Sequence, residues 1–186
     1  MKAIRLKYLA VLVLYGSSLF SLPLSGQGIP VSSSSQSPAY PPGFHYENIL
    51  PQLRSTFKGT IHLPKTFLEV GRKYPAYPRL LTVSADSYEL IFTPDKDEPC
   101  EGEHRCTYGR VTASGHPGIF DTPAQKVRLV NGTQGDFYKM SCGSYCGEAT
   151  LEWREGETYY TIGIKAGERK DLIEAVNSAI KVPNQR

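Results

Sequence analysis

The stretch ATLEWREGETYYTIGI, residues 149–164, decides the fold class of this chain. Apolar residues alternate with polar ones up to Trp153, Glu155-Gly156 can turn the chain, and the alternation resumes after the turn. A period of two on both sides of a turn is typical of a β-hairpin with one buried face. We therefore expect a hairpin that carries Trp153 into the core.

The residues after the hairpin change to a helical period. Gly167 precedes a segment, about 168–181, whose apolar side chains recur at helical spacing: Leu172, Ile173, Val176, Ala179 and Ile180. Charged residues take the positions between them, so the segment predicts an amphipathic helix. Because its apolar stripe needs a surface to cover, we expect the helix to pack on the sheet.

Upstream, β-branched and aromatic alternation predicts further strands at 59–63, 80–84, 88–93, 107–113, 126–130 and 136–140. A short helix is expected at 46–55, limited by Pro51, and Asn131-Gly132 predicts a turn. The expected fold class is α+β: one antiparallel β-sheet, flat or curved, with the C-terminal amphipathic helix packed on it and two disulfides.

The chain divides by composition into four parts. Residues 1–26 have the parts of a signal peptide: Lys2, Arg5 and Lys7, then the apolar run 8–20 and small residues. Residues 27–43 are an uncharged Ser/Pro-rich linker, 44–181 are long enough for a single α+β domain, and 182–186 form a C-terminal tail. We expect an exported protein, periplasmic or extracellular; an uncleaved membrane anchor is the alternative.

Export changes how the charge is interpreted. The whole chain has 21 basic and 18 acidic residues. All three charged residues of 1–26 are basic, so 18 basic residues face 18 acidic ones after cleavage. The net charge then gives no reason to expect a nucleic-acid partner. A membrane contact is expected only through an uncleaved signal segment.

All four cysteines, Cys100, Cys106, Cys142 and Cys146, lie in the exported part. An even number in an oxidising compartment predicts disulfides. Proximity favours Cys100–Cys106 and Cys142–Cys146, and cross-pairing remains open. A zinc site and a redox motif are further alternatives, but C-x5-C and C-x3-C match neither the paired C-x2-C of zinc ribbons nor the redox C-x-x-C. No cofactor is expected.

The acidic stretch 95–106, DKDEPCEGEHRC, offers two kinds of chemistry. Its carboxylates could bind calcium, but the spacing is not that of an EF-hand, and a disulfide-closed, solvated hairpin tip is the simpler interpretation. His104 with Glu101 or Glu103 could transfer protons in a small secreted hydrolase. An exposed lone histidine is the simpler interpretation.

A binding surface is expected in the stretch 65–79, KTFLEVGRKYPAYPR, which combines cationic residues and tyrosines: Lys65, Arg72, Lys73, Tyr74, Tyr77 and Arg79. Tyrosine rings beside cations can stack on sugars or hold acidic polymers. An ordinary exposed loop is the alternative.

Several motifs of the second half resemble a family of exported cyanobacterial proteins of unknown function. These motifs are Asp136-Phe137-Tyr138-Lys139, Ser141-Cys142-Gly143-Ser144 with Cys146, Leu151-Glu152-Trp153, Tyr160, and Ala175-Val176-Asn177-Ser178-Ala179-Ile180. Leu63-Pro64 and the pair Cys100 and Cys106 are similar to upstream features of that family. The resemblance implies export and a fold but no catalytic residue. The strand-rich body with its final helix also resembles periplasmic lipoprotein-carrier-like domains, which hold an acyl chain between sheet and helices.

The function expected from these observations is that of an exported, non-enzymatic, envelope-associated binding module. Its ligand would be a hydrophobic or lipid-like molecule between sheet and helix, or a cell-surface polymer such as a polysaccharide at residues 65–79. The small hydrolase that uses His104 is the first alternative. A structural or protein-interaction module is the second.

Overall fold

The computed structural model describes residues 43–67, 74–96, 106–143 and 146–181. The predicted signal peptide at 1–26, nearly all of the predicted linker at 27–43 and the predicted tail at 182–186 lie outside these residues. No helix in the described parts of the chain is long and apolar enough to span a membrane.

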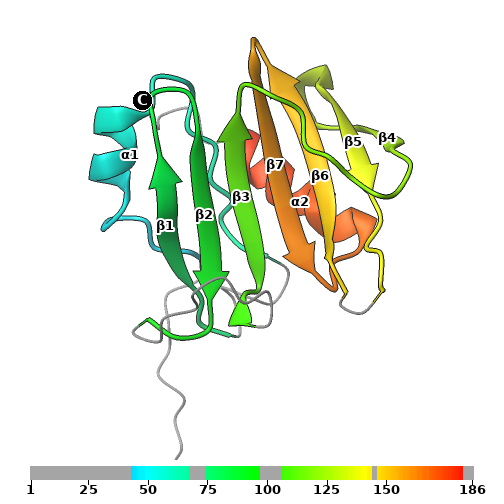
Figure 1. The fold of residues 1–186 in the computed structure, drawn as a ribbon, viewed down its shortest axis with the longest axis horizontal. Helices are drawn as coiled ribbons and strands as arrows, with labels where there is room; N and C mark the ends of the chain where they lie inside the picture. The colour runs from blue at the N-terminus through cyan, green and yellow to red at the C-terminus, as the bar shows by residue number, and fades with distance from the viewer. Residues whose placement is uncertain (1–42, 68–73, 97–105, 144–145, 182–186) are drawn as a thin grey trace, which may run out of the picture. The chain divides into compact units, whose positions relative to one another are not determined.

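The described residues form both α-helices and β-strands. In chain order the elements are α1 (Leu50–Thr56), β1 (Tyr77–Val83), β2 (Tyr88–Thr93), β3 (Gly109–Ser114), β4 (Gln125–Arg128), a 3-10 turn (Val130–Gly132), β5 (Gln134–Tyr138), β6 (Glu148–Glu155), β7 (Thr158–Lys165) and α2 (Arg169–Ile180). The strands form one seven-stranded antiparallel sheet in the order β1-β2-β3-β7-β6-β5-β4 (Figure 1). The predicted α+β class is thereby confirmed.

The predicted hairpin is confirmed as β6 and β7, and the strand order places it in the interior of the sheet. Trp153 pairs with Tyr160 across the two strands, and their rings stack with centroids 5.4 Å apart. Leu151 pairs with Ile162, and both are fully buried. Gly156 adopts a φ of 62° at the turn, a conformation that glycine tolerates better than other residues.

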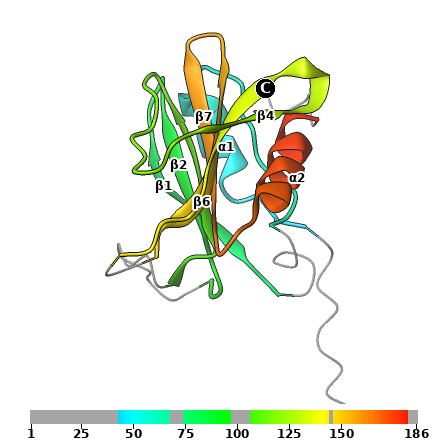
Figure 2. The same cartoon turned by 90° about the vertical axis from the view of Figure 1, so that its right-hand side faces the viewer.

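Helix α2 covers β6 and β7, which confirms the predicted packing of the C-terminal helix (Figure 2). A capping box starts the helix: the Glu168 N–H donates to the Asp171 carboxylate at 2.8 Å, and the Glu168 side chain accepts from the backbone N–H of Asp171. Of the apolar stripe predicted from sequence, Leu172, Val176 and Ala179 are buried, whereas Ile173 and Ile180 are partly buried and pack against the core. The buried side chains belong to the same hydrophobic core as Trp153.

The segment 43–67 covers the other half of the sheet on the same face as α2. Its aromatic rings contact β2, with centroids 4.5 Å apart for Phe44 and Phe92 and 5.0 Å apart for Phe57 and Tyr88. All four rings are members of the single hydrophobic core. The core therefore lies on one face of the sheet, between the strands and two covering segments, 43–67 and α2.

The strand predicted at 59–63 does not form. Its apolar side chains are buried, but its backbone pairs with no strand. Instead, the Tyr88 hydroxyl accepts a hydrogen bond from the His62 N–H at 3.3 Å and donates one to the His62 carbonyl at 3.0 Å. A side chain thus satisfies the backbone groups that a neighbouring strand would otherwise satisfy.

The His62 imidazole connects the segment 43–67 to β6 and to α2. It is buried, with Nε2 2.7 Å from a Glu155 carboxylate oxygen and Nδ1 3.4 Å from the Ala179 carbonyl oxygen of α2. Its ring also contacts the rings of Trp153 and Tyr160 edge-on, at 5.8 and 4.7 Å between centroids. The buried ring therefore has an oxygen atom near each nitrogen, one from the partly exposed Glu155 side chain and one from the backbone of α2.

Candidate functional site

The face of the sheet opposite α2, called the outer face below, carries two neighbouring rows of residues that are mostly polar, with Ile91 and Gly163 as the exceptions. Strand register places one row as Arg79, Ile91, Arg110, Gly163, Thr150 and Tyr138. The neighbouring row is Thr82, Glu89, Thr112, Thr161, Glu152, Asp136 and Lys126. These are the residues that alternate with the core positions along each strand.

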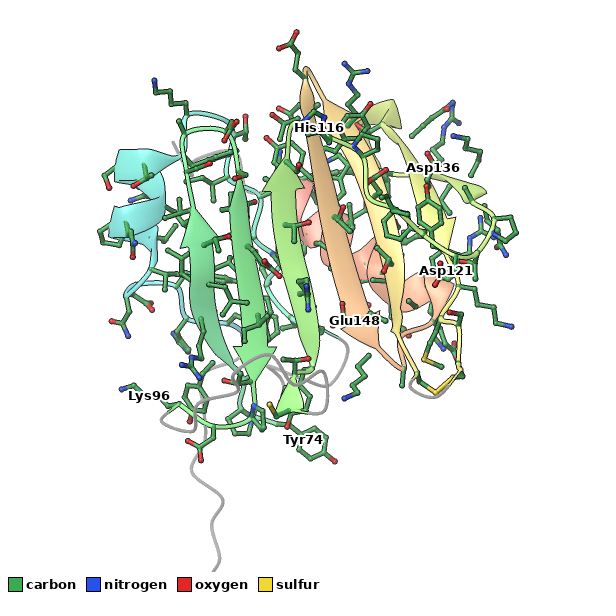
Figure 3. All side chains as sticks on the ribbon, viewed as in Figure 1. Tyr74, Lys96, His116, Asp121, Asp136 and Glu148 are labelled. Carbon is green, nitrogen blue, oxygen red and sulfur yellow. A yellow bond between two sulfur atoms is a disulfide. The ribbon has the colours of Figure 1, made fainter. Side chains whose placement is uncertain are left out.

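The loop 115–124, between β3 and β4, crosses the outer face in front of the central strands (Figure 1). It leaves β3 near His116 and reaches the side of β5 near Asp121 (Figure 3). The loop therefore lies between the central strands and the solvent on this face of the sheet. The loop thus forms a wall above the polar rows.

Three contacts hold this loop against the sheet. The Gly118 N–H donates to the Glu152 carboxylate at 2.6 Å, and the Thr122 hydroxyl donates to the Lys139 carbonyl at 3.2 Å. Between them, the Phe120 ring stacks on Tyr138 of β5, with centroids 3.8 Å apart and planes 24° apart. These contacts, all within the protein, hold the wall against the sheet.

A groove of about 380 Å³ lies between the loop 115–124 and the strands β3, β5, β6 and β7. Six hydroxyl-bearing residues line it: Thr112, Thr122, Tyr138, Ser141, Thr150 and Thr161. Four charged residues line it as well, Arg110 and Lys139 against Asp121 and Glu148. The lining therefore combines many hydroxyls with a balanced formal charge.

A glycine makes room for one of these charges. Gly163 lies in β7, beside Arg110 on one neighbouring strand and Thr150 on the other. A Cβ atom at Gly163 would overlap the Glu148 carboxylate, so the missing side chain lets this carboxylate lie over the strand. Glu148 thereby reaches the floor of the groove from the first position of β6.

The carboxylates of the second row have different environments. Burial raises the pKa of Glu152, the hydrogen bond from Gly118 lowers it, and the neighbouring Asp136 carboxylate raises it further, with a net upward shift. Asp136 in turn forms an ion pair with Lys126 at 2.7 Å, and this contact raises the Lys126 pKa. Glu152 is thus a buried carboxylate that accepts a hydrogen bond from the loop, and Asp136, beside it on β5, is ion-paired with Lys126.

Arg110 is held by a carboxylate from the adjacent strand. Its guanidinium is 2.7 Å from a Glu89 carboxylate oxygen, and both side chains are partly exposed. This pair keeps the guanidinium at the β3 side of the groove. Donor groups in a fixed geometry are what a binding site needs to orient a polar ligand.

The surface predicted at residues 65–79 does not form one cluster in the described chain. Lys65 lies beside α2, where its backbone N–H donates to the Ser178 hydroxyl at 3.0 Å. Arg79 lies on the outer face, in register with Ile91, and Tyr77 shares that face of β1. Tyr74 is 55% exposed before β1. Arg72 and Lys73 lie outside the described residues.

The cysteine prediction is confirmed for one pair, because Cys142 and Cys146 form a disulfide. This pairing excludes a disulfide between either residue and the first cysteine pair. Cys106 is disulfide-bonded, and Cys100 lies outside the described residues. A disulfide is typical of proteins outside the reducing cytoplasm.

Most of the acidic stretch 95–106, including Glu101, Glu103 and His104, lies outside the described residues, which stop at 96 and resume at 106. In the described parts of the chain, no three His, Cys, Asp or Glu side chains are grouped so that they could hold a metal ion.

Sequence reasoning missed the groove itself. Thr112, Thr150 and Thr161 are polar residues in strands whose sequences alternate between polar and apolar residues. That alternation predicts an ordinary solvent-facing side of a sheet. Only the loop 115–124 turns part of this side into a concave site. A weak signal was present in the loop, where an apolar Ile119-Phe120 pair interrupts a Gly/Pro-rich stretch.

Comparison of the chain with protein-family models, with characterised proteins and with solved structures gives no match. The resemblance to exported cyanobacterial proteins therefore stays a prediction, and the site must be interpreted from its own geometry.

Proposed function

We propose that this protein is an exported, non-enzymatic binding module of the cell envelope, and that its ligand is a neutral cell-surface polysaccharide held in the groove. The observation that carries the proposal is the lining, in which six hydroxyl-bearing residues accompany two positive and two negative side chains. Hydroxyls donate and accept hydrogen bonds, so they match the hydroxyl groups of a sugar chain. The balanced charge gives no preference for an acidic or a basic polymer.

The fixed wall of the groove supports the same proposal. The Phe120–Tyr138 stack and the Gly118–Glu152 hydrogen bond hold the loop in position through contacts within the protein itself. A preformed site loses little conformational entropy when a ligand binds. This matters for polar ligands, whose hydrogen bonds with the protein replace hydrogen bonds with water and gain little net free energy.

A polysaccharide bound in the groove is a better candidate than a lipid bound in the hydrophobic core. Between the sheet and α2, the side chains of Trp153, Ile162, Leu172 and Val176 pack together in the hydrophobic core and are at most 2% exposed. An acyl chain bound there would have to displace them. The groove on the outer face needs no such rearrangement.

The composition of the groove also favours binding over catalysis. Among the described residues that line it, no histidine is present to activate a threonine or serine hydroxyl. The predicted hydrolase residue His104 lies outside the described residues and gains no support from the groove.

Binding to a neutral glucan tests this proposal. Affinity electrophoresis of the domain in gels containing dextran would be compared with gels containing a uronic-acid polymer. Thr112→Val removes one hydroxyl from the groove while keeping the side-chain shape, and should weaken glucan binding about fivefold. Thr82→Val is the matched control, because Thr82 is exposed on the outer face at β1, apart from the groove residues.

The proposal predicts retardation by the neutral glucan that Thr112→Val reduces and Thr82→Val does not. Retardation by the uronic-acid polymer alone, or equal effects of both substitutions, would contradict it.

A further inference from the structure

The Cys142–Cys146 disulfide lies in the connection between β5 and β6, where the regular strand pairing has ended. The final regular pair is Tyr138 with Thr150, and beyond it the two cysteines form an isolated antiparallel bridge. Both cysteines are exposed to solvent. Their sequence separation is four residues, so the disulfide closes a small ring at the end of the hairpin.

The residues on either side of this disulfide belong to the groove. Ser141 and Gly147 both line it, and the Gly147 N–H donates to the Ser141 carbonyl at 2.9 Å. Lys139, on the same connection, accepts the hydrogen bond from Thr122 that holds the end of the loop 115–124. The disulfide therefore borders the strands that form the floor and the residue that anchors the wall.

Exposure makes the sulfur atoms accessible to a thiolate. Exchange requires attack on a disulfide sulfur, and exposed disulfides are in general more readily reduced than buried ones. Reduction here leaves the seven-stranded sheet intact, because none of the pairs that define its register lies within the ring closed by the disulfide. The change would be local to the β5–β6 connection and to the groove residues beside it.

We propose that Cys142–Cys146 is a thiol–disulfide exchange site for a dithiol reductant, and that its reduction weakens ligand binding in the groove. The second part rests on the proposed polysaccharide function, whereas the first part does not. In the exchange, a thiolate of the dithiol attacks one cysteine sulfur, the bond between the two cysteine sulfurs breaks, and a mixed disulfide forms. The second thiol of the reductant then displaces the protein sulfur. Two electrons and two protons pass to the cysteines, and the reductant leaves as its own disulfide.

The disulfide of Cys106 supplies an internal comparison. Cys106 directly precedes the β3 region and is partly buried, whereas Cys142 and Cys146 are both exposed. The proposal therefore requires selective reaction at one disulfide. A chain whose disulfides reacted alike would have no specific exchange site.

The exchange is tested on the full chain under native conditions. Graded dithiothreitol is followed by maleimide trapping and peptide mapping. Labelling of Cys142 and Cys146 is expected at least about tenfold faster than labelling of Cys106. Equal rates, faster labelling of Cys106, or no labelling of Cys142 and Cys146 until the protein unfolds would overturn the exchange site.

The link to the groove is tested separately with dextran as the probe. The double variant Cys142→Ser/Cys146→Ser should keep the circular dichroism spectrum of the wild type, and should bind dextran as weakly as the selectively reduced wild type. Selective labelling with unchanged dextran binding would overturn the link and leave the exchange site standing. Failure of the oxidised wild type to bind dextran would instead contradict the proposed function.

Discussion

The Gly118 backbone N–H donates a 2.6 Å hydrogen bond to the Glu152 carboxylate, and this contact joins the loop 115–124 to the middle of the sheet. Glu152 lies in β6 and is only 6% exposed, so the loop partly shields a carboxylate that the sheet alone would leave facing solvent. A charge-assisted hydrogen bond compensates part of the desolvation of that carboxylate. The wall of the groove and the ionisation of Glu152 are therefore coupled.

Replacing Glu152 with Gln should change how stability depends on pH. The raised pKa of Glu152 means that the folded protein holds this proton more tightly than the unfolded chain does. This contribution to the free energy of unfolding is complete below the unfolded pKa of about 4.3 and is lost as pH rises through the higher folded pKa. The stability of Glu152→Gln relative to the wild type should therefore increase over that range.

Urea unfolding of both proteins at a series of pH values from 4 to about 8 measures this difference. Parallel stability curves across the series would show that Glu152 titrates alike in the folded and unfolded states.

Gly118→Ala should displace the wall of the groove. A Cβ atom at Gly118 would overlap the Phe120 ring and lie 3.2 Å from a Glu152 carboxylate oxygen. Phe120 would have to leave its stack on Tyr138, so we expect a loss of about 1–2 kcal/mol in unfolding free energy together with weaker glucan binding.

Gly115→Ala is the control for that substitution, since a Cβ atom at Gly115 meets nothing within 4 Å. Thermal unfolding and affinity electrophoresis compare the two variants. Similar losses from both would mean that a general loop effect, rather than the Phe120 contact, is responsible.

Gly163→Ala should act through Glu148. The added methyl group would overlap the Glu148 carboxylate, so this side chain has to leave the floor of the groove. We expect a destabilisation of about 1–2 kcal/mol in the wild-type background and a smaller one when Glu148 is already Ala. A double-mutant cycle of unfolding free energies measures the difference, and additive effects would contradict the contact.

His62→Ala should cost about 2–4 kcal/mol of stability. The substitution removes the contacts of both ring nitrogens, with Glu155 and with the Ala179 carbonyl, and leaves a cavity beside Trp153. His45→Ala is the matched control, because His45 is exposed and forms only a 3.5 Å surface contact with Glu47. Urea denaturation compares the two, and equal midpoints would refute the role of His62 in joining the elements.

The hairpin and the final helix could be predicted closely because their signals are local. Alternation from Ala149 to Trp153 and helical spacing from Leu172 to Ala179 mark the side chains that one face of each element directs into the hydrophobic core. The predicted helix 168–181 and the observed α2 (Arg169–Ile180) differ by one residue at each end.

The prediction from sequence is wrong where a segment is buried although its backbone does not pair with a strand. Ile61 and Leu63 alternate with His62 like a strand, but they lie in an irregular segment, whose backbone is satisfied in part by the Tyr88 hydroxyl. Strand β1 begins at Tyr77, three residues before the predicted start, and includes Pro78. Proline is tolerated there because β1 is an edge strand of the sheet.

The sequence alone determined the period of each element, and with it the α+β class, the buried Trp153 and the burial of one face of the terminal helix. It also favoured the local Cys142–Cys146 pairing, since two cysteines four residues apart meet readily. These features depend on neighbours along the chain. The tertiary structure decided the rest: that Lys65 and Arg79 lie on opposite faces, and that Thr112, Thr150 and Thr161 share one groove. That groove exists because strands distant in sequence pair in register and a loop folds back over them, and neither strand order nor a loop's path is encoded in local periodicity.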